Sequence, residues 1–273
     1  MRLAVFTVFL LLMGLPCAPR AAAYERATVE GAPDLPLFWN RRRVVVRIAY
    51  DTSADVGAAD LREAMGRSLA TWSSLGACSD LVMVDLGATT GLTTNLGGGM
   101  HDEENRVVFR EEAWPPDVAA ETLAITTLVY RRSTGEVLDA DIDVNGVDHT
   151  WSVAVPVPTE SNDIENTMTH EFGHLIGFAH VADPDATMYG RSDPGDLSKR
   201  DLAPDDELAV CEVYPRGLPT PGGTGRRPEL SSGCAVSRGP QSRVPAAGLG
   251  LGLALILVGY RSIRRSRRAA HAA

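Results

Sequence analysis

The chain reads HEFGHLIGFAH from His170 to His180. On a helix, His170 and His174 lie one turn apart on the same face, so both imidazoles can bind one cation with Glu171 beside it. Gly177 can adopt the left-handed conformation that ends a helix and lets the chain bring His180 back to that cation. Three neutral imidazoles suit zinc best, and three protein ligands leave a fourth tetrahedral position open for water. The stretch therefore predicts a catalytic zinc site.

The alternative is that these histidines are hydrogen-bonded polar groups on a buried helix. The short pattern H-E-x-x-H arises by chance in about one chain in a hundred of this length, and the added glycine and third histidine make chance much rarer. Three of the six histidines lie within these eleven residues, and only His101 and His149 lie elsewhere in the expected folded part. This concentration favours the metal site.

The stretch resembles the H-E-x-x-H-x-x-G-x-x-H signature of the metzincin metalloproteases, and Met188 lies where that clan has its methionine turn. Tyr189 follows the methionine directly, which is most similar to the matrixin branch. The resemblance is specific from about residue 164 to residue 214. The residues at the end of this range are similar to the final matrixin helix. They are Leu197-Ser198, Asp205-Asp206 and the apolar run that ends Val213-Tyr214-Pro215.

The resemblance implies a zinc endopeptidase that acts on protein or peptide substrates. Zinc held by His170, His174 and His180 would lower the pKa of its bound water and polarise the scissile carbonyl. Glu171 would take the proton of that water and pass it to the leaving amine. Two other classes remain open: a non-catalytic zinc-binding cell-surface module, and an adhesive or structural surface protein. Glu171 argues against the first, because it is not needed to bind metal.

Hydrophobic periodicity predicts an α+β domain over residues 24–214, with a twisted mixed sheet of about five strands. The resemblance implies that this domain has a zincin-type, metzincin-like fold. Helices are expected at 58–75, at the zinc-binding stretch, and near the end of the domain. In the first helix, the residues expected to lie in the core are Leu61, Met65, Leu69 and Trp72. The expected strands are 43–50, 81–86, 106–109, 123–130 and 136–144.

The helix that carries the histidines is expected to begin near Asn162, which has capping-box spacing to Glu165, and to run to Leu175 or Ile176. Its predicted buried stripe consists of Ile164, Met168, Phe172 and Leu175. By composition alone, Met188 is a core methionine. The resemblance instead places it in a tight turn beneath the zinc ligands.

Two of the predicted strands carry further candidate sites. The strand 123–130 falls where matrixins have the edge strand that pairs with an extended substrate, so Ala124, Ile125 and Thr126 are candidate substrate contacts through their backbone. The next strand has Asp139, Asp141 and Asp143 on one face. Three such carboxylates either meet solvent or bind a hard cation such as calcium. By resemblance, the pocket wall is the polar segment 190–199, from which no preferred side chain follows.

The cysteines and the chain ends indicate export. Residues 1–23 have Arg2, a short apolar run and small residues before Tyr24, as in a secretory signal, with a lipoprotein signal at Cys17 as the alternative. Cys78 and Cys211 then form an even pair in an oxidising compartment, and we expect a disulfide between them. This bond would tie the end of an early helix to the last one.

The C-terminal part is expected to be a targeting tail. Residues 215–245 are rich in Pro, Gly, Ser and Arg and indicate a linker. Residues 246–273 combine a short hydrophobic helix with a cytoplasmic arginine-rich end. With Cys234 ahead of it, the layout resembles myxobacterial C-terminal sorting tails, and a plain membrane anchor is the alternative. The enzyme would then be displayed on the cell surface or released after processing.

Charge is distributed unevenly along the chain. Twelve of the 26 basic residues, but only one of the 35 acidic residues, lie outside 24–214, so the domain has 14 basic and 34 acidic residues and a net charge of −20. An acidic exported domain repels nucleic acid and anionic lipid, so neither is an expected partner. The basic tail is expected at the membrane before processing. We expect the domain to be monomeric.

Overall fold

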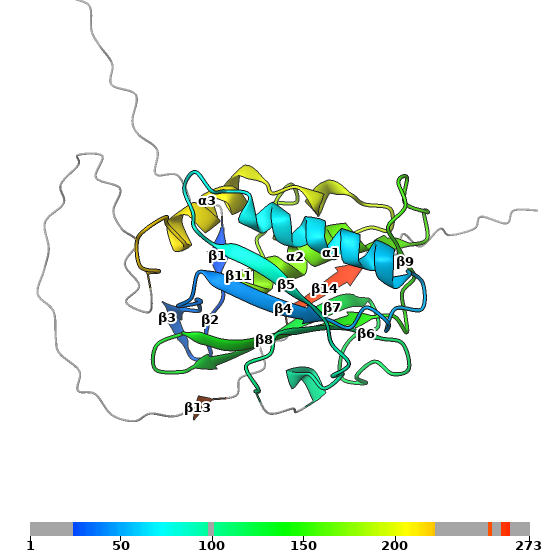
Figure 1. Cartoon of the computed structure of the whole chain (residues 1–273), viewed down its shortest axis with the longest axis horizontal. Coiled ribbons are helices and arrows are strands. Elements are labelled where there is room, and N and C mark those ends of the chain that lie inside the picture. Colours follow the sequence, from blue (N-terminus) through cyan, green and yellow to red (C-terminus); the bar gives the residue numbers. More distant parts are fainter. Residues whose placement is uncertain (1–23, 98–100, 222–250, 253–257, 263–273) are drawn as a thin grey trace, which may run out of the picture.

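The computed structural model of this protein describes residues 24–97, 101–221, 251–252 and 258–262. Its centre is a mixed sheet with the helices on one face (Figure 1). Four neighbouring strands are parallel, and the last is antiparallel to its neighbour. In spatial order the five are β5 (Val82–Ala88), β4 (Arg43–Ile48), β6 (Arg106–Arg110), β8 (Val137–Asn145) and β7 (Thr122–Arg131). The predicted α+β fold with five strands is confirmed.

The three helices in the described part are α1 (Ala58–Ser73), α2 (Ile164–Leu175) and α3 (Pro204–Val213). The predicted apolar face of α1 is buried, and Trp72 on that face donates its Nε1–H to the Thr169 carbonyl of α2 at 2.7 Å. The four residues of the predicted stripe on α2 are also buried, but so is every other residue of this helix. The expectation of one buried stripe is therefore too narrow, because α1, β7 and the 3-10 turn η2 (Ser198–Arg200) all pack against α2.

The structure corrects the predicted start of α2. Asn162 and Asp163 form the short strand β10 (Asn162–Asp163), and the N-cap residue is Asp163 rather than Asn162. The Asp163 carboxylate accepts the Asn166 N–H at 2.7 Å and also pairs with Arg200. An aspartate satisfies a free amide at a helix start and favours the positive end of the helix dipole.

Aromatic side chains satisfy the last carbonyls of α2. Trp39 donates its Nε1–H to the Leu175 carbonyl at 2.8 Å, and the Tyr214 hydroxyl donates to the Ile176 carbonyl at 2.6 Å. The next residue, Gly177, has a φ of +95°, and a Cβ there would lie 2.9 Å from the Leu37 carbonyl oxygen. The turn that follows α2 therefore requires glycine, as expected from its position between His174 and His180.

Short elements connect these parts. They form three two-stranded pairings: β1 with β11, β2 with β3, and β9 with β10. The strand β11 follows α2. The short elements are β1 (Glu25–Arg26), β2 (Thr28–Val29), β3 (Ala32–Pro36), β9 (Trp151–Ser152), β10 (Asn162–Asp163), β11 (Phe178–Ala179), β12 (Arg191–Ser192), and the 3-10 turns η1 (Asn95–Gly97) and η2 (Ser198–Arg200).

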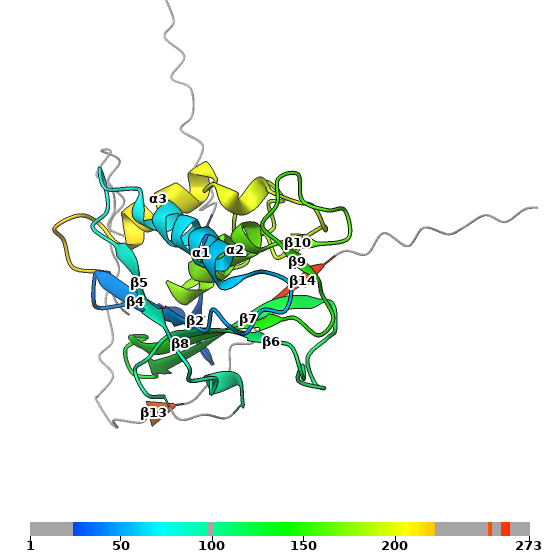
Figure 2. The same cartoon turned by 45° about the vertical axis from the view of Figure 1, so that its right-hand side comes forward.

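At its described residues, 251–252 and 258–262, the C-terminal tail does not have the predicted secondary structure. The sequence predicts a hydrophobic helix over 246–260, but β13 (Leu251–Gly252) and β14 (Val258–Ser262) are strands, so the helix is wrong at those residues. Both strands pair antiparallel with β7, and β14 also pairs in parallel with β12. Figure 2 shows β14 beside β7. The physical reason is that the outer edge of β7 offers backbone donors and acceptors that an extended segment can satisfy.

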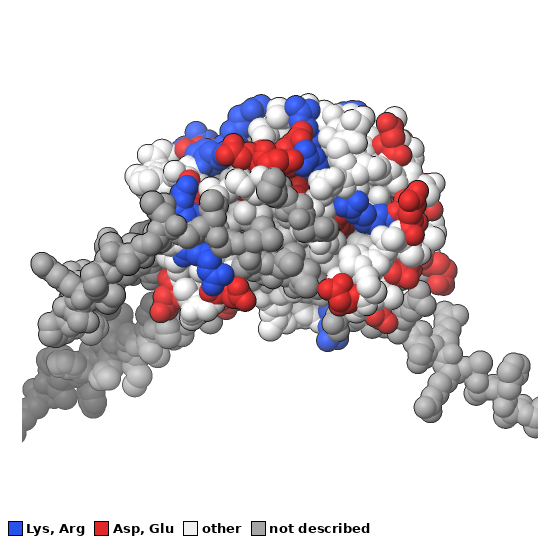
Figure 3. Space-filling model, turned by 90° about the horizontal axis from the view of Figure 1, so that it is seen from below, with Lys and Arg blue, Asp and Glu red and all other residues white. Residues whose placement is uncertain are grey.

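Other predictions about the chain ends fall outside the described residues, including the signal segment 1–23, Cys234 and most of the linker. Among the residues that are described, no helix has both the length and the apolar character that crossing a membrane requires. Acidic and basic side chains are interspersed on the face shown in Figure 3. The net negative charge of the domain therefore does not separate into one acidic surface on that side.

A disulfide joins Cys78, which follows α1, to Cys211 in α3, with their Cα atoms 5.2 Å apart. The same region has backbone connections, because Arg216 donates its N–H to the Cys78 carbonyl at 2.8 Å. The Ser79 hydroxyl also donates to the Tyr214 carbonyl at 2.6 Å. These contacts hold the end of α3 against the loop after α1. The hydroxyl of Tyr214 continues the connection to the end of α2.

Candidate metal centre

Three histidines from two adjacent segments converge on one point. His170 and His174 come from successive turns of α2, and His180 follows β11 after the turn at Gly177. The three Nε2 atoms lie 3.0, 3.1 and 3.1 Å from one another. In the described residues, this is the one group of His, Cys, Asp or Glu side chains whose ligand atoms gather within 4.8 Å.

Hydrogen bonds on the other ring nitrogens set the tautomers of two ligands. His170 Nδ1 lies 2.7 Å from the Thr187 carbonyl oxygen, and His174 Nδ1 lies 2.8 Å from the Phe178 carbonyl oxygen. A carbonyl can only accept, so both Nδ1 atoms carry hydrogen and both Nε2 lone pairs point to the shared centre. Burial is the main cause that lowers the pKa of all three histidines, to about 4 for His180.

The donor set fits zinc. Neutral imidazoles whose Nε2 lone pairs face one another at these distances repel unless a cation lies between them. Ligands 2.0–2.1 Å from a tetrahedral zinc lie roughly 3.3 Å apart, close to the separations seen here. The three imidazoles can therefore hold the ion with little movement.

Glu171 lies in the same turn of α2 as His170 and has no exposed surface. Its Oε2 atom accepts a hydrogen bond from the Thr126 hydroxyl at 2.6 Å, and its Oε1 atom has no hydrogen-bond partner in the described structure. Burial raises the pKa of Glu171 to about 8, and the hydrogen bond from Thr126 acts in the opposite direction. A cation at the three histidines would also lower this pKa.

Glycines allow the methionine turn to approach the ligands. Met188 is buried, and a Cβ added at Gly173 would lie 2.2 Å from its sulfur, so the turn packs directly on α2 between His170 and His174. A Cβ added at Gly190 would lie 2.7 Å from Nδ1 of His180. The resemblance already pointed to Met188. That Gly173 and Gly190 make these close contacts could not be predicted from one sequence.

The candidate substrate strand has partners along both edges. In β7, Ala124, Ile125 and Thr126 pair with β8 on one side. On the other side they pair with Tyr260, Gly259 and Val258 of β14. The β7 edge beside α2 therefore accepts an extended peptide segment. The segment runs antiparallel to β7 and, at its far end, parallel to β12.

Lys199 is a site residue that the sequence did not indicate. It lies in η2 at the end of the predicted pocket wall and is only 2 % exposed. Its Nζ donates to the carbonyls of Tyr189 and Arg191, the latter at 2.8 Å. Burial lowers the pKa of Lys199 to about 7. This buried lysine ties together the two ends of the segment 190–199.

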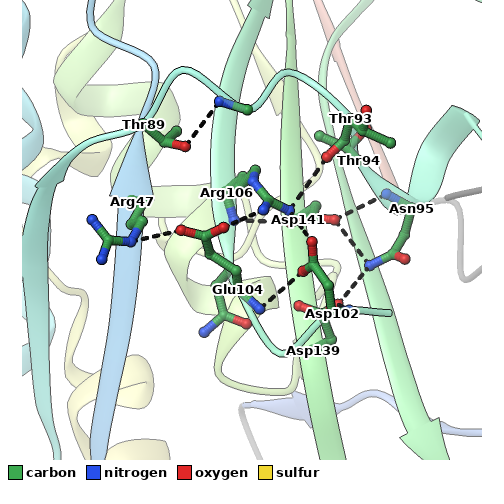
Figure 4. Close-up of polar contacts among 12 residues, drawn as sticks. Arg47, Thr89, Thr93, Thr94, Asn95, Asp102, Glu104, Arg106, Asp139 and Asp141 are labelled. Atoms are coloured by element: carbon green, nitrogen blue, oxygen red, sulfur yellow. Dashed lines mark hydrogen bonds and ion pairs between the residues drawn. The ribbon is translucent and has the colours of Figure 1, made fainter. Parts of the chain in front are cut away.

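The three aspartates of β8 lie on the sheet face opposite α2, and all of them are buried: Asp139, Asp141 and Asp143. The alternative that these carboxylates meet solvent is therefore wrong. Asn95 binds two of them, donating its backbone N–H to Asp141 at 2.9 Å and its side-chain N–H to both Asp139 and Asp141 (Figure 4). Arg110 donates to Asp143 at 2.6 Å. Protein donors hold all three carboxylates, and calcium binding there stays a prediction.

Comparisons with known proteins agree with this geometry. A family model described as Matrixin matches residues 38–215. Over 181 residues the chain is 28% identical to Metalloendoproteinase 1-MMP of Arabidopsis thaliana. This alignment covers 64% of this chain and 44% of that protein. Over 87 residues it is 31% identical to Probable matrix metalloproteinase 095L of Invertebrate iridescent virus 3, covering 32% of this chain and 23% of that protein. The chain thus aligns with less than half of each relative's length.

Proposed function

Because this chain belongs to the matrixin family, we propose that it is a zinc-dependent endopeptidase with His170, His174 and His180 as metal ligands and Glu171 as general base. The observation that carries the proposal is the convergence of three Nε2 atoms within 3.1 Å of one another. A buried carboxylate lies beside them on the same helix. Both relatives are named as metalloproteinases, which supports the reaction class.

Each group has a defined part in peptide hydrolysis. A zinc ion held by the histidines supplies a Lewis acid that polarises a carbonyl and lowers the pKa of water. Glu171 accepts the proton of the attacking water and delivers it to the leaving amine. A base whose pKa lies near the operating pH can both take and return a proton, and burial moves Glu171 in that direction. The Thr187 and Phe178 carbonyls keep two imidazoles oriented.

The direct test measures zinc and turnover in the purified full chain. We expect about one zinc per chain, cleavage of an unstructured protein such as casein, loss of cleavage with a chelator, and recovery on adding zinc. Zinc without cleavage would favour the non-catalytic zinc-binding module instead. A folded protein that binds no zinc would contradict the metal centre itself.

We also propose that substrates bind along the β7 edge at Ala124, Ile125 and Thr126. The pairing of β14 with these residues supports this, because backbone hydrogen bonds of this kind are available to any extended peptide. In the intact chain, β14 would then compete with substrate for the same edge.

Removing β14 should therefore increase the apparent affinity for substrate. A tethered segment competes at an effective concentration in the millimolar range, so a chain ending at Gly250 should show a KM about tenfold lower, with kcat unchanged. The measurement is steady-state cleavage of a fluorogenic peptide. A chain ending at Ile263, which retains β14 and loses most of the terminal arginines, is the matched control. Equal KM values for the two truncations would contradict competition by β14.

We propose further that the protein is exported. A signal-like segment at 1–23 supports this, and so does the Cys78–Cys211 disulfide, because disulfides persist in oxidising compartments. The tail around Cys234 and the terminal arginines would retain the enzyme at the cell surface until processing releases it. Fractionation of cells that express the full chain, with detection of both ends, would test the location and the processing.

A further inference from the structure

The Thr126 side chain connects the proposed substrate strand to the proposed base. Its hydroxyl lies 2.6 Å from Glu171 Oε2 and 3.3 Å from the Glu171 carbonyl oxygen, and Thr126 has no exposed surface. The two residues are 45 positions apart, one in β7 and the other in α2. The hydroxyl donates its hydrogen to Oε2. When Glu171 is ionised, as a base must be, this bond is charge-assisted, which makes it shorter and stronger than a bond between neutral groups.

The bond leaves the two carboxylate oxygens in different situations. Oε2 is held by Thr126, whereas Oε1 is buried and has no hydrogen-bond partner in the described structure. An unsatisfied buried acceptor is costly, so its retention beside a metal centre points to a ligand such as water. Anchoring one oxygen fixes the direction of the other.

We propose that Thr126 is a positioning residue that holds the Glu171 carboxylate by Oε2, so that Oε1 acts as the base. This inference rests on the proposed peptidase function. The backbone of Thr126 pairs with Val258 at the edge where substrate would bind, and its side chain holds Glu171. One residue therefore sets the position of the base relative to the substrate backbone.

The neighbouring residue Thr127 shows that a buried threonine hydroxyl in β7 does not always form a hydrogen bond. Thr127 is also buried, and its hydroxyl has no hydrogen-bond partner in the described part of the chain. Thr126 pairs with Ile142 and faces the helices, whereas Thr127 pairs with Asp141 and faces the other side of the sheet. Thr127 is thus a matched control with the same side chain, strand and burial.

Kinetics of full-chain variants test the proposal. Thr126→Val keeps the shape but removes the donor, so kcat should fall about 10- to 100-fold, the scale expected when a catalytic group loses its orientation. KM should stay within about twofold, because the β7 backbone is unchanged. Thr126→Ser should retain kcat within about threefold of the wild type, and Thr127→Val should match the wild type. Zinc content is measured for each variant.

A crystallographic readout on the metal-free proteins does not depend on activity. Glu171 should occupy a single orientation in the wild type and in Thr126→Ser, and a shifted or multiple orientation in Thr126→Val. The proposal is overturned if Thr126→Val resembles Thr127→Val in kcat, if serine fails to restore kcat, or if Glu171 keeps its orientation in Thr126→Val. A wild type that lacks peptidase activity, combined with a displaced Glu171 in Thr126→Val, would overturn the proposed function but support the positioning role.

Discussion

Glu171→Gln should reduce kcat/KM for peptide cleavage by about a thousandfold, within the range typical for loss of a general acid–base group. Glutamine has nearly the same shape, and its side-chain carbonyl oxygen can still accept the hydrogen of Thr126. It cannot take a proton from water. Because Glu171 is not one of the three converging side chains, zinc content should remain about one per chain.

The measurement for Glu171→Gln is steady-state cleavage together with metal analysis of the same sample. Glu160→Gln is a suitable control, because it removes the same charge at an exposed position before α2 and should match the wild type. Cleavage above about a tenth of the wild-type rate would exclude Glu171 as the base, since a general base contributes 10²–10⁴-fold. Loss of zinc in the variant would instead show that Glu171 supports metal binding.

Replacing Cys78 and Cys211 together by serine should lower the free energy of unfolding by up to about 4–5 kcal/mol, the chain-entropy value for a loop of this length. The disulfide closes a loop of 133 residues that includes four strands of the central sheet and the whole of α2. Removing it therefore increases the freedom of most of the unfolded domain. The native contacts of Arg216 with Cys78, and of Ser79 with Tyr214, would remain.

Denaturant unfolding of the double variant and of the oxidised wild type measures this loss. Reduction of the wild type should reproduce the midpoint of the variant. Cys234→Ser, which removes a cysteine of the linker, should leave the midpoint unchanged. An unchanged midpoint in the double variant would show that the bond does not constrain the unfolded chain.

Local patterns predicted most of the framework correctly because they reflect local physics. Runs rich in β-branched and other apolar residues, bounded by turn residues, place the five strands within a few residues of their observed bounds, since such runs suit buried strands. The helical spacing of Leu61, Met65, Leu69 and Trp72 gives the buried face of α1. The start of α2 was missed by one residue, because Asn162 and Asp163 are both good caps and only the structure shows that the Asp163 carboxylate accepts the Asn166 N–H.

Burial depends on neighbours that are distant in the chain. The sequence shows Asp139, Asp141 and Asp143 on one face of a strand but does not show that Asn95 and Arg110 lie over them. The apolar tail presents a similar case, because its hydrophobicity predicts a helix whereas the open edge of β7 pairs with it as a strand. In each case a partner far away in the sequence supplies the hydrogen bonds.

The three histidines, the adjacent glutamate and the turn at Gly177 can be predicted from local sequence, because helix periodicity and glycine's conformational freedom act within eleven residues. The support of that site depends on contacts that only the folded chain makes. Packing brings together the segments that supply this support: the Thr126 hydroxyl on Glu171, the Thr187 carbonyl behind His170 and the room for Met188 beside Gly173. Local spacing fixes which atoms are available for chemistry, whereas packing between distant segments fixes the direction in which they point.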